Sequence, residues 1–291
     1  MKAYMTERVI IVVPIHNGGD DTLELLQSIA DSETPDLEII IVDDGSTDGS
    51  AALIATHFPS VTILTGDGGL WWAGATNLGV REALRRGADY VLTMNNDNVV
   101  GHGFLRPLLS VVRSETRSIV TSKLLSLSEP GYVCSFGGCI DWLRGEIRDR
   151  TNRRDHLDFS SPARAEWVHA SSTIYPSAVF HDIGYFDSDN FPQYHGDADF
   201  SLRAARAGYS LLVEPRSVVY RRTATSGGLI LLDKGGFWRN VTDIRSIFYY
   251  KANYNLYFTH CRRKPFQLFL LIRYVRLLYS LLHRRLFRSN T

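Results

Sequence analysis

Apolar residues in the first 120 positions form short continuous runs, separated by longer stretches in which apolar and polar residues alternate with helical spacing. The runs are rich in β-branched residues and predict buried strands at 8–13, 38–42, 60–64, 89–94 and 118–122. The stretches between them predict helices over Asp21–Asp31, Asp48–His57, Gly74–Gly87 and Phe104–Arg113. Alternation of this kind is typical of an α/β fold with a mostly parallel central sheet flanked by helices.

The periodicity changes in the second half of the chain. It fails from about 126 to 167, and the dense charge run at 144–158 predicts a solvated loop. A strand followed by a short helix is predicted within 168–187, and an amphipathic helix follows the sequence GDAD at 196–199. The segment Thr223–Gly236 has glycine pairs and small polar residues, which predict a mobile lid. Two final helices are predicted over Asn240–His260 and Phe266–Phe287.

Composition narrows the class of protein. The chain has 291 residues, 44% of them hydrophobic, which is enough for a sizeable core, and its net charge of +1 gives no reason to expect a nucleic-acid partner. The three cysteines, Cys134, Cys139 and Cys261, have no metal-binding spacing and favour a reducing, cytoplasmic compartment. The first apolar run, Val9–Ile15, is too short for a signal peptide or a membrane span.

Polar residues gather directly after three predicted strands. The sequences PIHN (14–17), DDGSTDGS (43–50) and NNDN (95–98) follow the first, second and fourth strands. Ligands of parallel sheets bind at the carboxyl ends of strands, so we expect Asp43, Asp44 and Asp97 to lie at a site. Buried carboxylates are costly unless donors or a cation meet them. Asp48 is better explained as a turn and helix cap.

The stretch GGLWWAGATNLG, from Gly68 to Gly79, has the spacing of a phosphate-binding Walker A loop. Alanine replaces the lysine whose ammonium reaches the phosphates, so the match does not indicate an ATPase.

Five motifs together resemble those of the family 2 inverting glycosyltransferases with the GT-A fold. They are VVPIHN (12–17), IIIVDDGSTDGS (39–50), GATNLGVREAL (74–84), LTMNNDN (92–98) and YHGDADFSLRAARAGY (194–209), in the family's order and spacing. The resemblance covers about residues 7–225 and is closest to a rhamnosyltransferase-like branch, in which Asn-Asn-Asp replaces Asp-x-Asp. It implies a catalytic domain over 1–236, with a nucleotide-sugar half at 1–122 and an acceptor half at 123–236. Residues 237–291 would form a helical extension.

The resemblance also implies a set of donor-binding residues. The helix that opens at Gly74–Gly79 would favour the diphosphate at its N-terminus, while Trp71 and Trp72 would shape the sugar pocket or simply pack there. The residues implied in donor binding are Pro14, Asn17, Asp43, Trp72, Gly74, Asn77, Asn96 and Arg221, with Asp44, Trp71 and Arg222 as secondary candidates.

A divalent cation, Mg²⁺ or Mn²⁺, is expected on Asp97, because hard cations prefer carboxylate oxygens and bridge phosphates. Members of the family often supply a further histidine ligand near 215–220, where this chain has Tyr220. That departure leaves open that Arg221 or Arg222 neutralises the diphosphate instead.

The catalytic base is expected in the acidic motif at 194–209. An inverting transfer needs a carboxylate near the acceptor hydroxyl, and by resemblance this is Asp197. Asp199 is the secondary candidate, because its spacing of four residues from Arg203 favours a structural ion pair.

The predicted function is transfer of a sugar from a nucleoside-diphosphate sugar to a hydroxyl of a glycan or lipid-linked glycan, in cell-surface polysaccharide synthesis. Two alternatives stay open. A sugar nucleotidyltransferase would normally carry a basic loop after the first strand, which PIHNGGDD lacks. An inactive sugar-nucleotide-binding protein would fit the weakened metal motif.

The last predicted helix suggests where the enzyme works. From Arg262 to the end the chain has eight basic residues and no acidic one. At 100° per residue, Arg273, Arg276 and the polar residues after them fall within an arc of roughly 140°. This pattern favours a helix at the inner face of the cytoplasmic membrane, with arginines reaching acidic headgroups. Packing on the catalytic domain or in a homodimer is the alternative.

Overall fold

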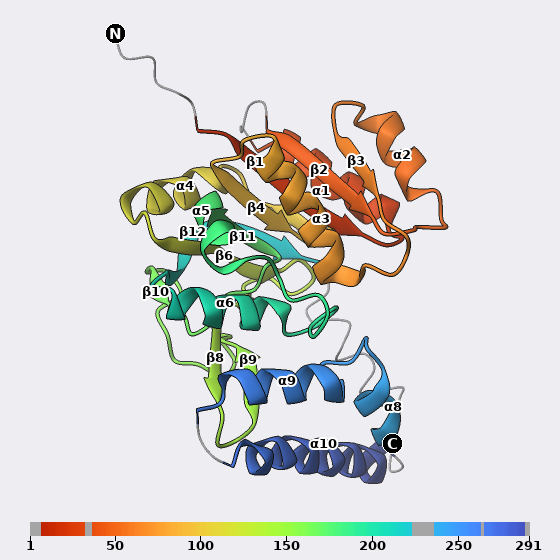
Figure 1. The fold of residues 1–291 in the computed structure, drawn as a ribbon, viewed down its shortest axis with the longest axis vertical. Coiled ribbons are helices and arrows are strands. Elements are labelled where there is room, and N and C mark those ends of the chain that lie inside the picture. Colours follow the sequence, from red (N-terminus) through yellow and green to blue (C-terminus); the bar gives the residue numbers. More distant parts are fainter. Residues whose placement is uncertain (1–6, 33–36, 223–235, 263–264, 289–291) are drawn as a thin grey trace.

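The structure is a computed structural model that describes residues 7–32, 37–222, 236–262 and 265–288. A ten-stranded mixed sheet forms its upper part, and two helices at the C-terminal end form a separate layer below it (Figure 1). The predicted lid at Thr223–Gly236 lies outside the described residues, except for Gly236.

The sheet confirms the predicted α/β class. Its main path runs β10-β12-β6-β11-β4-β1-β2-β3, with β5 beside β12 and β7 beside β6. The parallel half consists of β1 (Val9–Ile15), β2 (Glu38–Asp43), β3 (Thr62–Thr65) and β4 (Tyr90–Met94). The remaining strands are β5 (Asn98–Val100), β6 (Ser118–Ser126), β7 (Val133–Ser135), β10 (Ala163–Arg164), β11 (Ser172–Pro176) and β12 (Ser210–Arg221).

Helices cover both faces of the sheet, and alternate residues of β1 show which helix lies where. Ile11 and Val13 face the core formed with α1 (Gly19–Ala30), α2 (Ser50–His57) and α4 (Leu105–Ser114). Ile10 and Val12 face the core formed with α3 (Trp71–Arg85), α5 (Ser177–Ile183) and α6 (Gly196–Arg206). Burial on both faces explains why β1 is a continuous apolar run.

We predicted a solvated loop for the charge run at 144–158, and the structure shows more order there. It contains β9 (Glu146–Asp149), which pairs with β8 (Gly138–Asp141) in a hairpin outside the main sheet. Arg148 donates to both carboxylate oxygens of Asp155, at 2.8 and 3.0 Å. The run therefore contains a paired strand and an internal ion pair, although most of its residues are charged or polar.

The predicted helix Asn240–His260 is two helices, α8 (Phe237–Thr242) and α9 (Tyr250–His260). Side chains between them bind the backbone and compete with helical hydrogen bonds. Asp243 accepts the N–H of Arg245 at 2.9 Å, and Ser246 accepts the N–H of Phe248 at 3.1 Å. These local bonds turn the chain before α9.

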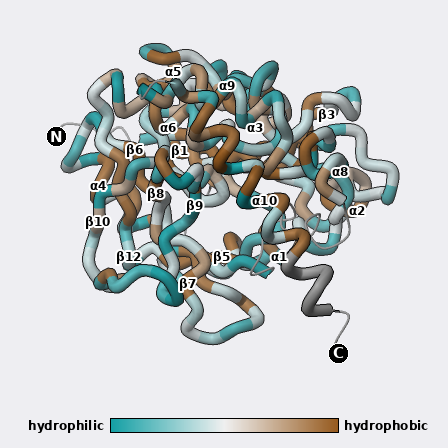
Figure 2. Tube along the Cα trace, turned by 90° about the horizontal axis from the view of Figure 1, so that it is seen from below, coloured by the Kyte–Doolittle hydropathy of each residue, from teal (hydrophilic) through white to brown (hydrophobic). Residues whose placement is uncertain are grey.

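The helix α10 (Phe266–Arg288) packs against α9 and completes the lower layer, which Figure 2 shows from below. Its inward face contributes Phe266, Leu270, Tyr274 and Leu277 to a separate apolar cluster that also contains Tyr257 of α9. No helix in the described part of the chain is both long enough and apolar enough to cross a membrane.

Arg273 and Arg276 of α10 bind the protein, whereas the sequence predicted that they would reach acidic headgroups. Arg273 is only 6% exposed and donates to the carbonyl oxygens of Gly145, at 2.8 Å, and Ile247, at 3.2 Å. Arg276 donates to the carbonyl oxygen of Arg144 at 2.6 Å and pairs with Glu146. Carbonyls left without strand partners at the turn of the β8–β9 hairpin thus hold the polar side of α10 on the catalytic domain.

Candidate active site

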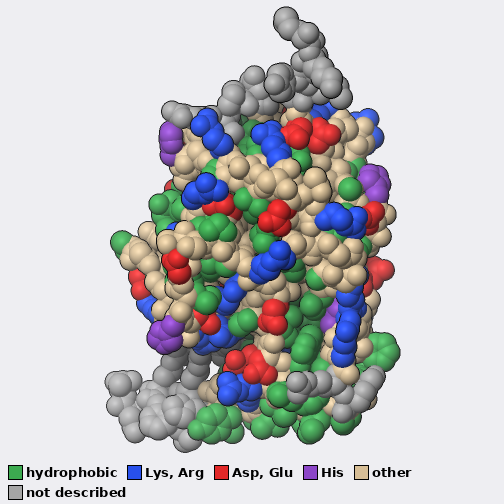
Figure 3. Space-filling model, turned by 90° about the vertical axis from the view of Figure 1, so that its left-hand side faces the viewer, with side chains coloured by type: hydrophobic (Ala, Val, Ile, Leu, Met, Phe, Trp, Pro, Cys, Tyr) green, Lys and Arg blue, Asp and Glu red, His purple; other side chains and the backbone are tan. Residues whose placement is uncertain are grey.

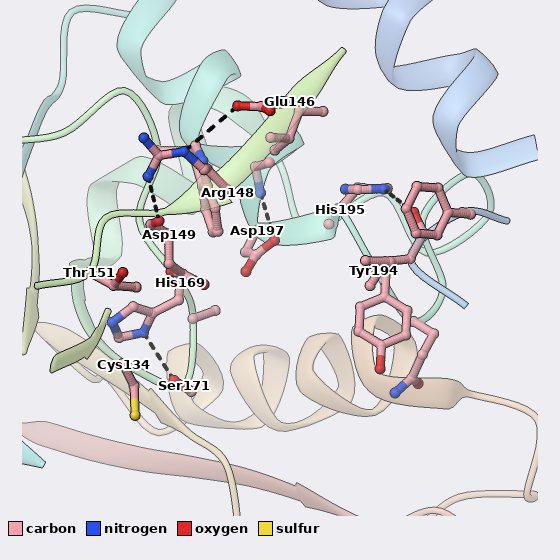
Figure 4. A pocket seen from close by; sticks show the side chains of 18 of the residues that line it. Cys134, Glu146, Arg148, Asp149, Thr151, His169, Ser171, Tyr194, His195 and Asp197 are labelled. Carbon is pink, nitrogen blue, oxygen red and sulfur yellow. Dashed lines mark hydrogen bonds and ion pairs between the residues drawn. The ribbon is translucent and has the colours of Figure 1, made fainter. Parts of the chain in front are cut away.

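A cavity of about 740 Å³ opens between the sheet edge, the N-terminus of α6, the β8–β9 hairpin and α10. Of the residues predicted from the sequence, it brings together Trp72, Asp97, Asp197 and Arg221. Figure 4 shows the side chains around it, with Asp197 reaching into the middle of the group. Predicted residues that do not line it are Pro14, Asn17, Asp43, Asp44, Trp71, Gly74, Asn77, Asn96, Asp199 and Arg222.

Asp197 lies in the first turn of α6, two residues after the N-cap residue His195, whose backbone is left-handed with φ of 70°. The carboxylate accepts the N–H of Ala198 at 2.8 Å. Burial of this carboxyl, and then the negative charge of Asp149, raise its pKa to about 7. Because the folded pKa lies above the ordinary value of 3.8, ionising Asp197 costs stability as the pH rises from about 4 to about 7. A carboxyl with a pKa near neutrality is suited to accept a proton.

Asp199 is occupied by structural contacts. One carboxylate oxygen pairs with Arg203 at 2.8 Å, as the spacing predicted, and the other binds Nε2 of His260 at 2.8 Å. Asp199 is 3% exposed and therefore joins α6 to α9 inside the protein.

The three residues of the NND motif (95–97) lie in two different surroundings. Asn95 and Asp97 line the cavity, and the Oδ1 atom of Asn95 accepts the indole N–H of Trp72 at 3.1 Å. Asn96 instead contacts Gly18 and Thr22 of the α1 region through its amide nitrogen, at 3.4 and 3.3 Å. The sequence favoured Asn96 for the donor, whereas the neighbouring Asn95 is the amide that lines the cavity.

The helix α3 begins at Trp71, three residues earlier than predicted. Its first N–H groups already have protein acceptors: Trp71 donates to Asp44, Trp72 to Gln193, and Ala73 to Pro192. The N–H of Gly74 donates to the carbonyl of Leu70 inside the helix, at 3.1 Å. The carboxylate of Asp44 thus occupies the helix terminus at which the sequence predicted the diphosphate.

Asp44 is the main acceptor in this region. Its Oδ1 atom accepts the N–H groups of Gly68, at 2.9 Å, and Leu70, at 3.2 Å, and its Oδ2 atom accepts that of Trp71 at 2.8 Å. Asp43 beside it accepts the N–H of Ser46 at 2.9 Å. Asp48 accepts the N–H of Ser50 at the start of α2, the capping role expected from the sequence.

The remaining predicted residues of this half have structural partners. Asn17 joins two loops, because its N–H donates to Ser46 and its Oδ1 atom accepts the N–H of Thr47, at 2.8 and 2.9 Å. Pro14 is buried in β1 opposite Val42. Asn77 exchanges two hydrogen bonds with the backbone of Phe186, at 2.8 and 3.0 Å.

The two arginines at the end of β12 lie in different places. Arg221 lines the cavity and donates to Ser171 at 3.3 Å, whereas Arg222 pairs with Asp21 at 2.9 Å and with Glu24 of α1. Tyr220 lies in β12 opposite Val99, as part of the sheet. Arg221 is therefore the arginine placed to meet a ligand in the cavity.

Several cavity residues were missed by the sequence analysis. His169, in the loop before β11, is buried, and burial together with the charge of Arg221 lowers its pKa to about 3, so it is neutral. Asp149 comes from the hairpin that was predicted as loop. Glycine at 145 between alternating residues of IDWLRGEIRD is a hairpin signal that could have found it.

The residues that line the cavity can be compared with the ligands that a divalent cation needs. The described residues contain no cluster of three His, Cys, Asp or Glu side chains that could hold a metal by themselves. Mg²⁺, however, is commonly held by one or two carboxylates together with substrate phosphates. Asp97 at the end of β4 fits such a site, in which the donor supplies the other ligands.

Solved structures share the fold of this chain. The chain matches GalNAc-T7, solved with UDP, GalNAc and Mn²⁺, with a TM-score of 0.61 and 14% identity over 76% of this chain and 44% of that longer one. It also matches residues 1–349 of TarS from S. aureus, with a TM-score of 0.55 and 15% identity over 93% and 81% of the two chains. The fold is that of a GT-A glycosyltransferase.

The chain belongs to glycosyl transferase family 2, whose sequence model matches residues 10–159, more than half of its length. Glycosyltransferase GlyG of Streptococcus pneumoniae is 23% identical over 76% of this chain and 73% of its own. An N-acetylglucosaminyl-diphospho-decaprenol L-rhamnosyltransferase of Mycobacterium tuberculosis is 21% identical over 77% and 79%. The chain is therefore a glycosyltransferase with a rhamnosyltransferase among its relatives.

The substitution Asp44→Asn tests the link between β2 and α3. The carboxylate of Asp44 accepts three backbone N–H groups, and in asparagine one of its two oxygens is replaced by an N–H₂ group that cannot accept. We expect a loss of roughly 1.5–3 kcal/mol in the free energy of unfolding, as for other hydrogen bonds to charged groups. Urea denaturation measures it.

The matched control is Asp67→Asn in the same loop, where the exposed carboxylate accepts the N–H of Gly69 at 2.9 Å. Equal losses for the two variants would contradict the special role given to Asp44.

Proposed function

We propose that the protein transfers a sugar, with inversion, from a nucleoside-diphosphate sugar to a hydroxyl group of a glycan acceptor. The observation that carries this proposal is the position of Asp197, a half-buried carboxyl with a pKa raised to about 7, in the same cavity as Asp97 and Arg221. A base and two groups that suit a diphosphate are what a single displacement needs.

In the proposed reaction, the acceptor oxygen attacks the anomeric carbon of the donor sugar while the bond to the diphosphate breaks. Asp197 takes the proton of the acceptor hydroxyl, and the nucleoside diphosphate leaves with the bonding electron pair. Arg221 stabilises the negative charge that develops on the leaving group. Trp72, held by Asn95, forms the wall against which the donor sugar lies.

Asp97 would hold a divalent cation, Mg²⁺ or Mn²⁺, together with the donor phosphates. When bound, the cation supplies charge neutralisation of the leaving group.

Solvent is restricted on the other side of the cavity by α10, whose Leu277 and Leu281 line it.

We further propose that the acceptor is lipid-linked and that the enzyme works at the inner face of the cytoplasmic membrane. The outward face of α10 carries apolar side chains one turn apart, including Leu271, Val275 and Tyr279, which are 58%, 56% and 68% exposed. Hydrophobic side chains gather at this lower end of the molecule in Figure 3. Leu268, Leu278 and Leu282 extend the same surface, here called the α10 face.

Charge supports a membrane rather than a protein partner for the α10 face. Two of the eight basic residues after 261, Arg273 and Arg276, are used inside the protein. The other six lie before and after the apolar stretch of α10 in the sequence. No acidic residue lies between them. Apolar area combined with basic residues favours an anionic lipid surface.

The first prediction concerns the base. Asp197→Asn should keep nucleotide-sugar binding while lowering turnover by roughly 10²–10⁴-fold, because only the proton acceptor is lost. In the wild type, kcat/KM should rise with pH through about 7, the pKa of Asp197. Steady-state kinetics with a radiolabelled donor measure both.

The comparison variant is Asp199→Asn, which removes an acceptor from Arg203 or His260 and should lower stability more than the intrinsic rate of the folded fraction. Normal turnover of Asp197→Asn beside an inactive but folded Asp199→Asn would reverse the two assignments.

The second prediction concerns the cation. Excess EDTA should abolish transfer, Mn²⁺ or Mg²⁺ should restore it, and Asp97→Asn should require more metal for half-maximal activity. Activity is measured across a metal titration, with Asp21→Asn, in α1 and outside the cavity, as control. Full activity in EDTA would leave Arg221 as the phosphate-binding group.

The third prediction concerns the α10 face. The full chain should sediment with phosphatidylglycerol vesicles and much less with phosphatidylcholine vesicles. Leu271→Gln combined with Val275→Gln should reduce binding at least fivefold, whereas Leu127→Gln with Leu157→Gln, exposed leucines elsewhere, should not. If the wild type ignores vesicles and forms a dimer by light scattering that the α10 variant disrupts, the face is a homodimer interface.

A further inference from the structure

The β8–β9 hairpin brings a second carboxylate into the cavity. Asp149 ends β9 and pairs with Gly138 at the base of the hairpin. One of its oxygens accepts the hydroxyl of Ser135 at 2.5 Å. Asp149 and Asp197 come from different elements and both lie at the same cavity in Figure 4.

The other end of the hairpin is fixed to α10. Gly145 has a φ of +65°, and a Cβ atom there would lie 2.9 Å from Cβ of Arg273, so the helix approaches too closely for a side chain. Arg273 binds the carbonyl oxygen of Gly145, and Arg276 binds that of Arg144 and the carboxylate of Glu146. The hairpin is therefore tied at its turn, which fixes where Asp149 stands.

The other acidic groups of the cavity have different positions or partners. Glu146 pairs with Arg276, and Asp97 stands at the end of β4, on the sheet side. The two histidines are neutral at pH 7, because burial lowers the pKa values of His169 and His195 to about 3.

Burial raises the pKa of Asp149 as well, and the charges of Arg221 and Arg148 oppose that rise and favour its ionised form. The direct contacts of the basic groups are with other residues. Arg148 is paired with Asp155, Arg221 contacts Ser171, and Arg154 lies in the loop that follows the hairpin. Arg273 and Arg276 bind the hairpin turn. Among all these groups, Asp149 is the one whose charge raises the pKa of Asp197, after burial itself.

We propose that Asp149 is a positioning residue for the transfer reaction, because its carboxylate, fixed on the hairpin, faces Asp197 and makes Asp197 a stronger base towards the acceptor hydroxyl. Two neighbouring carboxylates titrate as a coupled pair, in which the first negative charge disfavours the second. The inference rests on the proposed function, since it needs Asp197 as the base.

The test is the pH dependence of nucleotide-sugar hydrolysis, in which water replaces the unidentified acceptor. Removing the charge with Asp149→Asn should move the acidic limb of kcat/KM to lower pH by roughly one unit. The plateau rate should fall several-fold, because a weaker base accepts the proton less readily. Asp149→Glu, which keeps the charge, should restore the limb of the wild type.

Asp141→Asn on β8 is the matched control, because Asp141 belongs to the same hairpin but not to the cavity lining. Titration of the ¹³C-labelled Asp197 carboxyl by NMR measures its pKa without any need for turnover. A second variant, Asp149→Ser, removes the same charge with a side chain that packs differently. An unchanged titration of Asp197 in both Asp149→Asn and Asp149→Ser overturns the inference. A wild type that turns over no nucleotide-sugar, with Asp197 still shifted by Asp149, overturns the proposed function alone.

Discussion

The contact between Asp44 and the start of α3 is the constraint on which the Trp72 side of the cavity depends. One carboxylate at the end of β2 receives three backbone N–H groups from residues 68–71. A buried carboxylate without such donors would cost several kcal/mol, so the loop can take only the conformation that supplies them. That conformation starts α3 at Trp71, turns Trp72 towards Asn95 and sets the wall of the cavity. The same contact occupies the helix terminus that the sequence suggested for a diphosphate.

On the opposite side, α10 has two roles that its sequence alone does not separate. Its arginines fix the turn of the β8–β9 hairpin, while its apolar residues divide between an inner cluster and the exposed α10 face. A helix that is apolar on two faces needs a covering on both. The catalytic domain covers one, and the flanking basic charge suits an anionic lipid for the other. One helix thus lines the cavity and carries the proposed membrane side of the molecule.

Much of the fold followed from local patterns. The parallel strands and their helices were predicted because burial on both faces leaves a continuous apolar run, as in β1. The strand-end rule grouped Asp43, Asp44 and Asp97, of which only Asp97 lines the cavity, and Asp197 came from the family resemblance. The i, i+4 spacing of Asp199 and Arg203 predicted an ion pair that the structure contains. Asn240–His260 was wrong as a single helix, because the side chains of Asp243 and Ser246 bind the backbone locally.

By itself, the sequence determined the α/β class, the family and the acids at the strand ends, since these depend on periodicity and on residues close together in the chain. Only the tertiary structure decided which acids share a cavity. Asp149 and Asp197 are 48 positions apart in the sequence and meet because α10 holds the hairpin. It also decided that Asp44 caps α3 and that Arg273 faces inward. Such roles depend on which distant backbone groups lack partners after folding, and no local pattern records that.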